Sequence, residues 1–257
     1  CMIWGILYGP EYVNLLHRAV KHFLPEPHEI ICMTENADGV DQSVTVEPLP
    51  KLPIKDSFWI KGGWPKLAVF KPGFIPDGTR VLFVDLDTII TGDMSAMFET
   101  GPQVTMVQEW KRLVDYLNPF RAQKQLSSVF AFDAGREGAI YDAFVADPVA
   151  AQQTFRIEQY FLAHHATALN TWPAGWIQSF KRHLLPPRLG VRNAETVAQP
   201  DAQCKMLIFH GEPRPIDVVQ DQVWGKRFRY GHGPIPYMLD YWRQFGIEPP
   251  TSQEKVS

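Results

Sequence analysis

The stretch RVLFVDLD, from Arg80 to Asp87, places two carboxylates directly after a run of apolar residues. The apolar run predicts a buried strand. Because side chains alternate along a strand, Asp85 and Asp87 are expected to point to one side and Leu86 to the other. Open α/β sheets bind their ligands at the carboxyl ends of strands. The stretch therefore predicts a ligand site at the end of a strand in an α/β fold.

The two acids are candidate metal ligands. Neighbouring carboxylates repel each other unless a cation compensates their charge. A hard ion such as Mn²⁺ or Mg²⁺ accepts carboxylate ligands and keeps coordination sites for phosphate oxygens. The alternative is a pair of solvated acids in a turn after the strand, because an Asp-X-Asp pattern alone is a weak signal.

The rest of the chain alternates between short apolar runs and segments of helical periodicity. Strands are expected over residues 3–7, 29–33, 43–47, 80–84, 104–108, 129–132 and 205–209. Helices are expected over residues 11–23, 65–70, 138–146, 155–164 and 237–245. A strand, a helix and a second strand at the start indicate a doubly wound α/β arrangement.

Composition restricts the possible partners. The chain has 257 residues, 45% of them hydrophobic and 21% charged, with a formal net charge of −3. These values predict one domain over residues 1–248 with a polar tail over residues 249–257, and they argue against a nucleic-acid partner. No apolar run is long enough for a transmembrane segment, and no signal peptide is recognisable. We expect a cytoplasmic protein, with a peripheral position at the inner membrane surface as the alternative.

The sequence from WPKL, which begins at Trp64, to DLDT, which ends at Thr88, resembles the core of glycogenin-like, retaining glycosyltransferases. Bacterial members with the same two motifs are the most similar. The resemblance implies the GT-A fold of nucleotide-diphospho-sugar transferases, a Rossmann-like mixed sheet flanked by helices. It also implies that Asp85 and Asp87 bind Mn²⁺, and that Asp85 and Leu86 contact the donor nucleotide sugar.

A later segment, FHGEPRP from Phe209 to Pro215, is similar to a motif in which His and Gly are followed by a basic residue and Pro. The resemblance implies that His210 is the third metal ligand, and that Gly211 and Arg214 contact the diphosphate. Arg214 stands in place of the usual Lys. Lys66, at the start of a short expected helix, is a further candidate to lie near the phosphates.

Two more segments match the family in their order along the chain. Leu7 and Tyr8 stand where the family binds the base and ribose of the donor. Glu158 and Gln159 resemble the acidic residue–Gln pair beside the transferred sugar. Leu126, however, replaces the Asn that many members have before the small residues that correspond to Ser127 and Ser128, which weakens a sugar contact there.

The predicted function is the metal-dependent transfer of a sugar from a nucleotide-sugar donor, with UDP-sugar preferred, to a hydroxyl of a carbohydrate or glycoconjugate acceptor. Negative charge develops on the departing diphosphate, and a metal ion with a fixed guanidinium stabilises it. The resemblance implies retention, with Glu158 and Gln159 as the catalytic pair. An inverting reaction would instead need a carboxylate base such as Asp133.

Two other functions compete with this one. The pattern DLDTI, which begins at Asp85, nearly fits a phosphatase of the haloacid dehalogenase type, although the later acidic cluster of that family does not follow. A non-catalytic nucleotide-sugar-binding module keeps the same donor and metal residues, so the sequence barely separates it from an enzyme.

Several site residues also have purely structural explanations. His210 is also explained as a core histidine, although the attached Gly211 and Arg214 favour the ligand role. Glu158 with Gln159 is explained equally well as a solvated helix face. Surface or packing roles explain a further group equally well, namely Arg214, Lys66 and Tyr8. Lys181, which follows Phe180, is a candidate to bind an anionic group.

Overall fold

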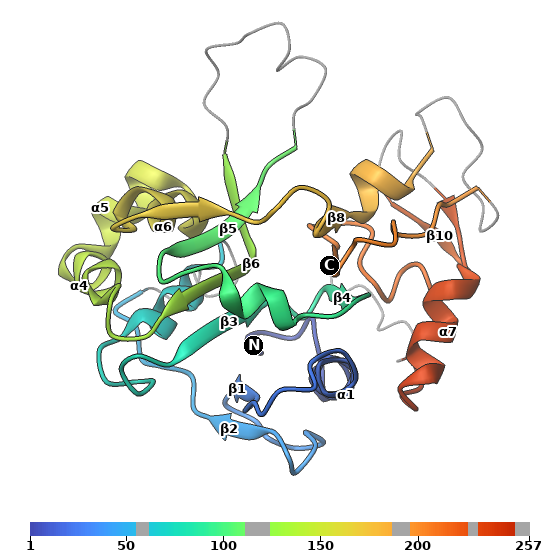
Figure 1. The fold of residues 1–257 in the computed structure, drawn as a ribbon, viewed down its shortest axis with the longest axis horizontal. Coiled ribbons are helices and arrows are strands. Elements are labelled where there is room, and N and C mark those ends of the chain that lie inside the picture. The colour runs from blue at the N-terminus through green and yellow to red at the C-terminus, as the bar shows by residue number, and fades with distance from the viewer. Residues whose placement is uncertain (55–61, 111–123, 187–195, 226–230, 250–257) are drawn as a thin grey trace, which may run out of the picture.

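The strand before the acidic pair is β3 (Arg80–Val84), the first strand of a four-stranded mixed sheet with the order β3-β6-β5-β7 (Figure 1). The computed structural model describes residues 1–54, 62–110, 124–186, 196–225 and 231–249. β6 (Gln125–Asp133) runs antiparallel to β3 and to β5 (Val104–Gln108). β7 (Leu169–Thr171) runs parallel to β5. This architecture confirms the expected mixed sheet.

A second sheet has the order β4-β9-β8 and continues from the acidic pair. β4 (Thr88–Ile90) is antiparallel to β9 (Met206–Ile208), which is parallel to β8 (Ile177–Ser179). Two smaller sheets complete the described strands: parallel β1 (Ile31–Met33) with β2 (Thr45–Glu47), and antiparallel β10 (Val223–Trp224) with β11 (Gly231–His232).

The helices lie around the sheets. In Figure 1, α4, α5 and α6 gather at one side of the molecule, and α7 lies at the other. The α-helices are α1 (Pro10–Phe23), α4 (Gly138–Ala146), α5 (Pro148–Phe155), α6 (Glu158–His165) and α7 (Pro236–Gln244). Shorter helical segments are the 3₁₀ helices η1 (Trp64–Phe70) and η2 (Ser95–Glu99) and the π-helix η3 (Phe180–Leu184).

Two hydrophobic clusters pack against opposite faces of the β3–β6 pair. Phe83 of β3 and Phe130 of β6 belong to a cluster with η1, α4 and α6. Val84 and Val129, the next pair in register, belong to a cluster with α1, β4, β9 and α7. Successive residues of a strand point to opposite faces, so this pair separates the two cores. The acidic turn follows β3 where both cores meet.

Most elements lie where the apolar pattern predicts them. The bounds of β3, β5 and α4 agree with the expected ranges, and α1, η1, β9 and α7 agree to within one residue at each end. β6 is longer than the range expected from its apolar residues. Parallel pairing of β1 with β2 and of Met2 with Met33 agrees with the doubly wound start.

Two expectations about elements are wrong. Residues 3–7 form no strand, because Gly5 adopts a positive φ of 69° and starts a turn that leaves Leu7 55% exposed. Residues 155–164 do not form one helix, because Arg156 has a φ of 62° and separates α5 from α6. The start of α5 has a local sequence signal: Asp147 caps the helix by accepting a hydrogen bond from Ala150 N–H at 2.9 Å, and Pro148 follows it.

None of the described helices is both long and apolar enough to cross a membrane. The division into a domain over residues 1–248 and a tail over 249–257 stays a prediction, and residues 250–257 of that tail lie outside the described part of the chain.

The stacked phenylalanines of the β3–β6 pair provide a test of the fold. Phe130 stacks on Phe83 and Phe70, with ring centroids 4.9 and 5.7 Å apart. Phe130→Ala should lower the free energy of unfolding by about 3–5 kcal/mol, because it leaves a cavity between rings that cannot collapse. Urea denaturation measures this change. Val149→Ala on the exposed side of α5 is the control, with an expected change within about 0.5 kcal/mol. Equal effects of the two substitutions would contradict the core assignment.

Candidate functional site

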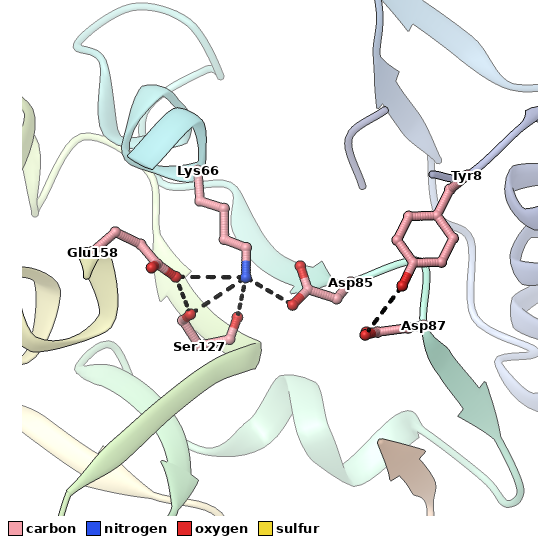
Figure 2. A network of polar contacts seen from close by, with 6 residues as sticks. All are labelled: Tyr8, Lys66, Asp85, Asp87, Ser127 and Glu158. Carbon is pink, nitrogen blue, oxygen red and sulfur yellow. Dashed lines mark hydrogen bonds and ion pairs between the residues drawn. The ribbon is translucent and has the colours of Figure 1, made fainter. Parts of the chain in front are cut away.

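The two acids lie in a turn and not on the strand itself. β3 ends at Val84, and Thr88 N–H closes the turn by donating to the carbonyl of Asp85 at 3.1 Å. Strand alternation therefore does not set their directions. Leu86 has its side chain buried in a hydrophobic core cluster, at 6% exposure. Anchoring this middle residue fixes the turn, while the two carboxylates point into the polar network drawn in Figure 2.

Lys66 lies between two carboxylates at the centre of this network (Figure 2). It comes from η1, and its ammonium is 2.7 Å from Asp85 Oδ2 and 3.5 Å from Glu158 Oε1. The ammonium also donates to Ser127 Oγ at 3.3 Å. Burial lowers the pKa of Lys66, but the charges of Asp85 and Glu158 outweigh this effect and raise it to about 12. Lys66 is therefore a buried, charged group and not a surface lysine.

Glu158, the first residue of α6, is also buried, at 4% exposure. Its carboxylate accepts a short hydrogen bond from Ser127 Oγ, and its N–H donates to the carbonyl of Gly62 at 3.0 Å. Gly63 adopts a φ of 68°, and a Cβ there would come within 2.6 Å of the carboxylate. Glycine at this position thus leaves room for Glu158. The alternative of a solvated helix face is wrong for Glu158.

Ser127 is the residue of this network that sequence reasoning left unassigned. It is a buried serine of β6, and its hydroxyl links Lys66 to Glu158 (Figure 2). Burial of a hydroxyl is unfavourable unless it is hydrogen-bonded. Ser127 lies outside the strand expected over residues 129–132, so no sequence pattern indicated that its hydroxyl is buried.

Asp87 differs from Asp85 in its partners. Tyr8 OH donates a long hydrogen bond of 3.5 Å to Asp87 Oδ2, whereas Oδ1 is buried and has no hydrogen-bond partner among the described residues. Burial, followed by the negative charge of Asp85, raises the pKa of Asp87 to about 7. Burial also raises the pKa of Asp85, although Lys66 opposes this shift. The acidic turn therefore holds more negative charge than Lys66 compensates.

His210 lies near this turn through the backbone, because Phe209 N–H donates to the carbonyl of Asp87 at 3.1 Å. Its Nε2 is 2.7 Å from Ser179 Oγ, and its ring stacks on Trp110 with centroids 6.3 Å apart. Among the residues that the structure describes, no three His, Cys, Asp or Glu side chains form a group that could hold a metal ion. The triad of Asp85, Asp87 and His210 stays a prediction.

Arg214 is engaged by a neighbouring acid. Its guanidinium contacts Asp217 at 3.3 and 3.4 Å, and its main-chain N–H donates to the same carboxylate at 2.7 Å. Gly211 adopts a φ of 75° at the start of this loop. Hydrogen bonding to Asp217 raises the pKa of Arg214 against the effect of burial. The contact of Arg214 with a diphosphate stays a prediction.

The other expected residues are less closely connected to the network. Leu7 is an exposed turn residue, and Gln159 is half-buried beside Glu158. Asp133 pairs with Arg80 across the opposite end of β3, with 3.1 Å between their charged atoms. This position separates Asp133 from the acidic turn by the length of the strand, so the structure gives no support to Asp133 as a base at this site.

The mixed sheet flanked by helices is similar to the GT-A fold of several solved glycosyltransferases. Among solved structures, the galactosyltransferase LgtC in complex with donor and acceptor sugar analogs matches with a TM-score of 0.57. The identity is 9%, and the match covers 93% of this chain and 94% of LgtC. The sequence matches no protein-family profile and no curated protein.

Two other glycosyltransferases have similar folds but longer chains. The bifunctional glycosyltransferase WbbM matches with a TM-score of 0.57 and 10% identity, over 93% of this chain and 48% of WbbM. GlyE of Streptococcus pneumoniae TIGR4 matches with a TM-score of 0.53 and 12% identity, over 95% of this chain and 63% of GlyE. At these identities the likeness establishes a shared fold, and it confirms the fold expected from the sequence.

The buried ion pairs of Lys66 provide a test of the site. Lys66→Met should lower the free energy of unfolding by about 3–5 kcal/mol, because two buried carboxylates lose their cation. Lys71→Met, at the exposed end of η1, is the matched control and should change it little. Urea denaturation of both variants measures the difference.

A double variant separates electrostatics from packing. Adding Glu158→Gln to Lys66→Met removes one of the uncompensated charges, so the double variant should be more stable than the sum of the two single effects predicts. Strict additivity would contradict the direct coupling of Lys66 and Glu158.

Proposed function

We propose that this chain is a glycosyltransferase that binds a nucleoside diphosphate sugar, with UDP-sugar as the first candidate, and a divalent cation, Mn²⁺ or Mg²⁺. The acceptor is a hydroxyl of a carbohydrate or glycoconjugate. One observation supports the proposal above the others: Asp87 Oδ1 is buried without a hydrogen-bond partner among the described residues, beside a second carboxylate that Lys66 already compensates.

The acidic turn fits a hard cation on chemical grounds. An unpaired buried oxygen costs free energy, and a cation at that oxygen would remove the cost. The raised pKa of Asp87 has the same origin, since burial and Asp85 both disfavour its negative charge. In this proposal Asp85 and Asp87 hold the ion, with His210 as the third ligand. When bound, the ion would stabilise the negative charge that develops on the departing diphosphate.

The residues of the chain have separate roles in this reaction. Lys66 fixes the separation of Asp85 and Glu158, because its ammonium contacts both carboxylates. Glu158 and Gln159 at the start of α6 orient the transferred sugar and stabilise an oxocarbenium-like transition state. Tyr8, at 3.5 Å from Asp87 Oδ2, holds the acidic turn from the side of the nucleotide. Leu7 and Leu86 contribute backbone contacts to the donor.

The reaction proceeds with retention in this proposal. The chain then needs no carboxylate base at the acceptor hydroxyl, because the departing diphosphate itself takes the proton from that hydroxyl. Interactions that strengthen on the diphosphate as it departs therefore supply most of the catalysis. The position of Asp133 at the far end of β3 agrees with this scheme.

The competing functions make different predictions. The matched folds are those of glycosyltransferases, which disfavours a phosphatase of the haloacid dehalogenase type. A non-catalytic binding module would bind the nucleotide sugar without releasing sugar to water. Hydrolysis of the donor in the presence of Mn²⁺ therefore separates an enzyme from a binding module.

The metal proposal predicts that Asp87→Asn weakens the binding of Mn²⁺ and UDP by at least about 100-fold, because it removes a charged ligand from a buried site. Calorimetric titration of UDP in the presence of Mn²⁺ measures this loss. Asp142→Asn, an exposed acid of α4, is the control and should bind like the wild type. Retained Mn²⁺ and UDP affinity in a folded Asp87→Asn variant would overturn the metal assignment.

The mechanism predicts that Glu158→Gln and Gln159→Ala lower kcat roughly 100-fold or more and change KM for the donor much less. This pattern marks an interaction made in the transition state. Initial-rate measurements give both constants, and melting curves check that Glu158→Gln remains folded. NMR of the product from an α-linked donor reports the anomeric configuration, and a β-linked product would exclude retention.

A further inference from the structure

A second lysine lies at the same edge of the structure as the acidic turn. Lys181 follows β8 in η3, and its ammonium donates a short hydrogen bond to the main-chain carbonyl of His210. A Cβ placed on Gly211 would lie 3.6 Å from this ammonium nitrogen. The positive charge of Lys181 therefore lies directly against the His210–Gly211 segment.

The three-stranded sheet explains why these residues meet. Ser179 of β8 is in register with Ile208 of β9, and Ile208 is in register with Thr88 of β4. The parallel strands β8 and β9 end at this edge of the sheet, and the antiparallel strand β4 begins here. The next residues beyond this row are Phe180, Phe209 and Asp87, and Lys181 and His210 follow one position further on. Side-chain contact between His210 and Ser179 reinforces the arrangement.

Arg214, the basic residue to which the resemblance assigns the diphosphate, has a different environment. Asp217 accepts hydrogen bonds from both the guanidinium and the main-chain N–H of Arg214. The carboxylate compensates the charge of the guanidinium and fixes the loop that contains both residues. These contacts use Nε and one N–H of Nη2, and the carboxylate of Asp217 reduces the net positive charge that Arg214 offers to a phosphate.

A diphosphate at this edge needs positive charge from the protein. The buried acids Asp85, Asp87 and Glu158 outnumber Lys66, so the network in Figure 2 by itself repels an anion. A lysine binds phosphate as a point charge on a flexible stem. A hydrogen bond from its ammonium to an anionic phosphate oxygen is stronger than one to a neutral carbonyl such as that of His210.

We propose that Lys181 binds the diphosphate of the donor from the β8–β9 edge, and that Arg214 acts through Asp217 to hold the loop after His210. This inference rests on the proposed function, because it assumes a nucleoside diphosphate at the acidic turn. The resemblance assigns the diphosphate contact to Arg214, whereas this inference assigns it to a residue on a different element of the fold.

The test compares UDP, UMP and uridine by calorimetric titration in the presence of Mn²⁺. Lys181→Met should weaken UDP binding roughly 10- to 100-fold, the range expected for a lost hydrogen bond between charged groups, and should leave uridine affinity unchanged. UMP should show a smaller loss than UDP. Lys181→Arg, which keeps the charge, should recover a substantial part of the UDP affinity.

Two control variants make the result specific to Lys181. Arg182→Met removes a positive charge from the next position of η3 and should bind UDP like the wild type. Arg214→Met should lower the melting temperature through the loss of its Asp217 contacts, and it should weaken UDP binding less than Lys181→Met does.

The possible outcomes distinguish this inference from the proposed function. Wild-type protein that fails to bind UDP with Mn²⁺ would overturn the proposed function, and this inference with it. Wild-type binding that Lys181→Met leaves unchanged would overturn the role of Lys181 alone. Equal losses of UDP and uridine in a folded Lys181→Met variant, or a larger phosphate-specific loss in Arg214→Met, would also overturn it.

Discussion

The buried ammonium of Lys66 connects the elements that form the site. It reaches from η1 to Asp85 after β3 and to Glu158 at the start of α6, and it contacts Ser127 of β6 on the way. A charge in such a position is stable only while its partners stay close, because desolvation is expensive for an unpaired ion. The ion pairs therefore fix the distance between the acidic turn and α6. The proposed function places a sugar between the donor phosphates and α6, and this requires such a fixed separation.

Apolar packing around this ion pair also holds the acidic turn in place. Leu86 anchors the acidic turn in one hydrophobic cluster, whereas Leu67, which follows Lys66, is buried in the other. Each cluster lies on its own face of the β3–β6 pair, so the polar network is located where the two cores meet. Close-packed cores resist small displacements. The carboxylates are accordingly held in place by apolar contacts as well as by Lys66.

Charge is distributed unevenly over the site. Lys66 compensates part of the negative charge of Asp85 and Glu158, but Asp87 keeps a buried oxygen without a partner among the described residues. The acidic turn thus favours a cation. The positive groups that can bind an anion come from the segments after β8 and β9. The proposed ligand, with its anionic phosphates and bound metal ion, suits an acidic turn that lies near basic residues. This division of charge unites the proposed metal site with the proposed role of Lys181.

The sequence by itself determined the features that depend on local patterns. Apolar periodicity located β3, β5 and α4, and the motif order gave the fold and most of the candidate residues. The turns could not be predicted from apolar periodicity. Gly5, with a positive φ, starts a turn inside an apolar run that resembles a strand, and Arg156 divides an expected helix into two.

Only the tertiary structure decided which groups contact one another. Lys66 pairs with Glu158 across a long stretch of chain, Ser127 links the two, and Ser179 contacts His210 from a neighbouring strand. The Arg214–Asp217 pair, by contrast, joins residues three positions apart, and the diphosphate contact of Arg214 stays a prediction. Sequence patterns report the propensity of a segment and the face it buries, whereas ion pairs and buried hydroxyl contacts depend on where distant segments meet. Strand register and the packing of the two cores determine where distant segments meet, and neither follows from the sequence of any single segment.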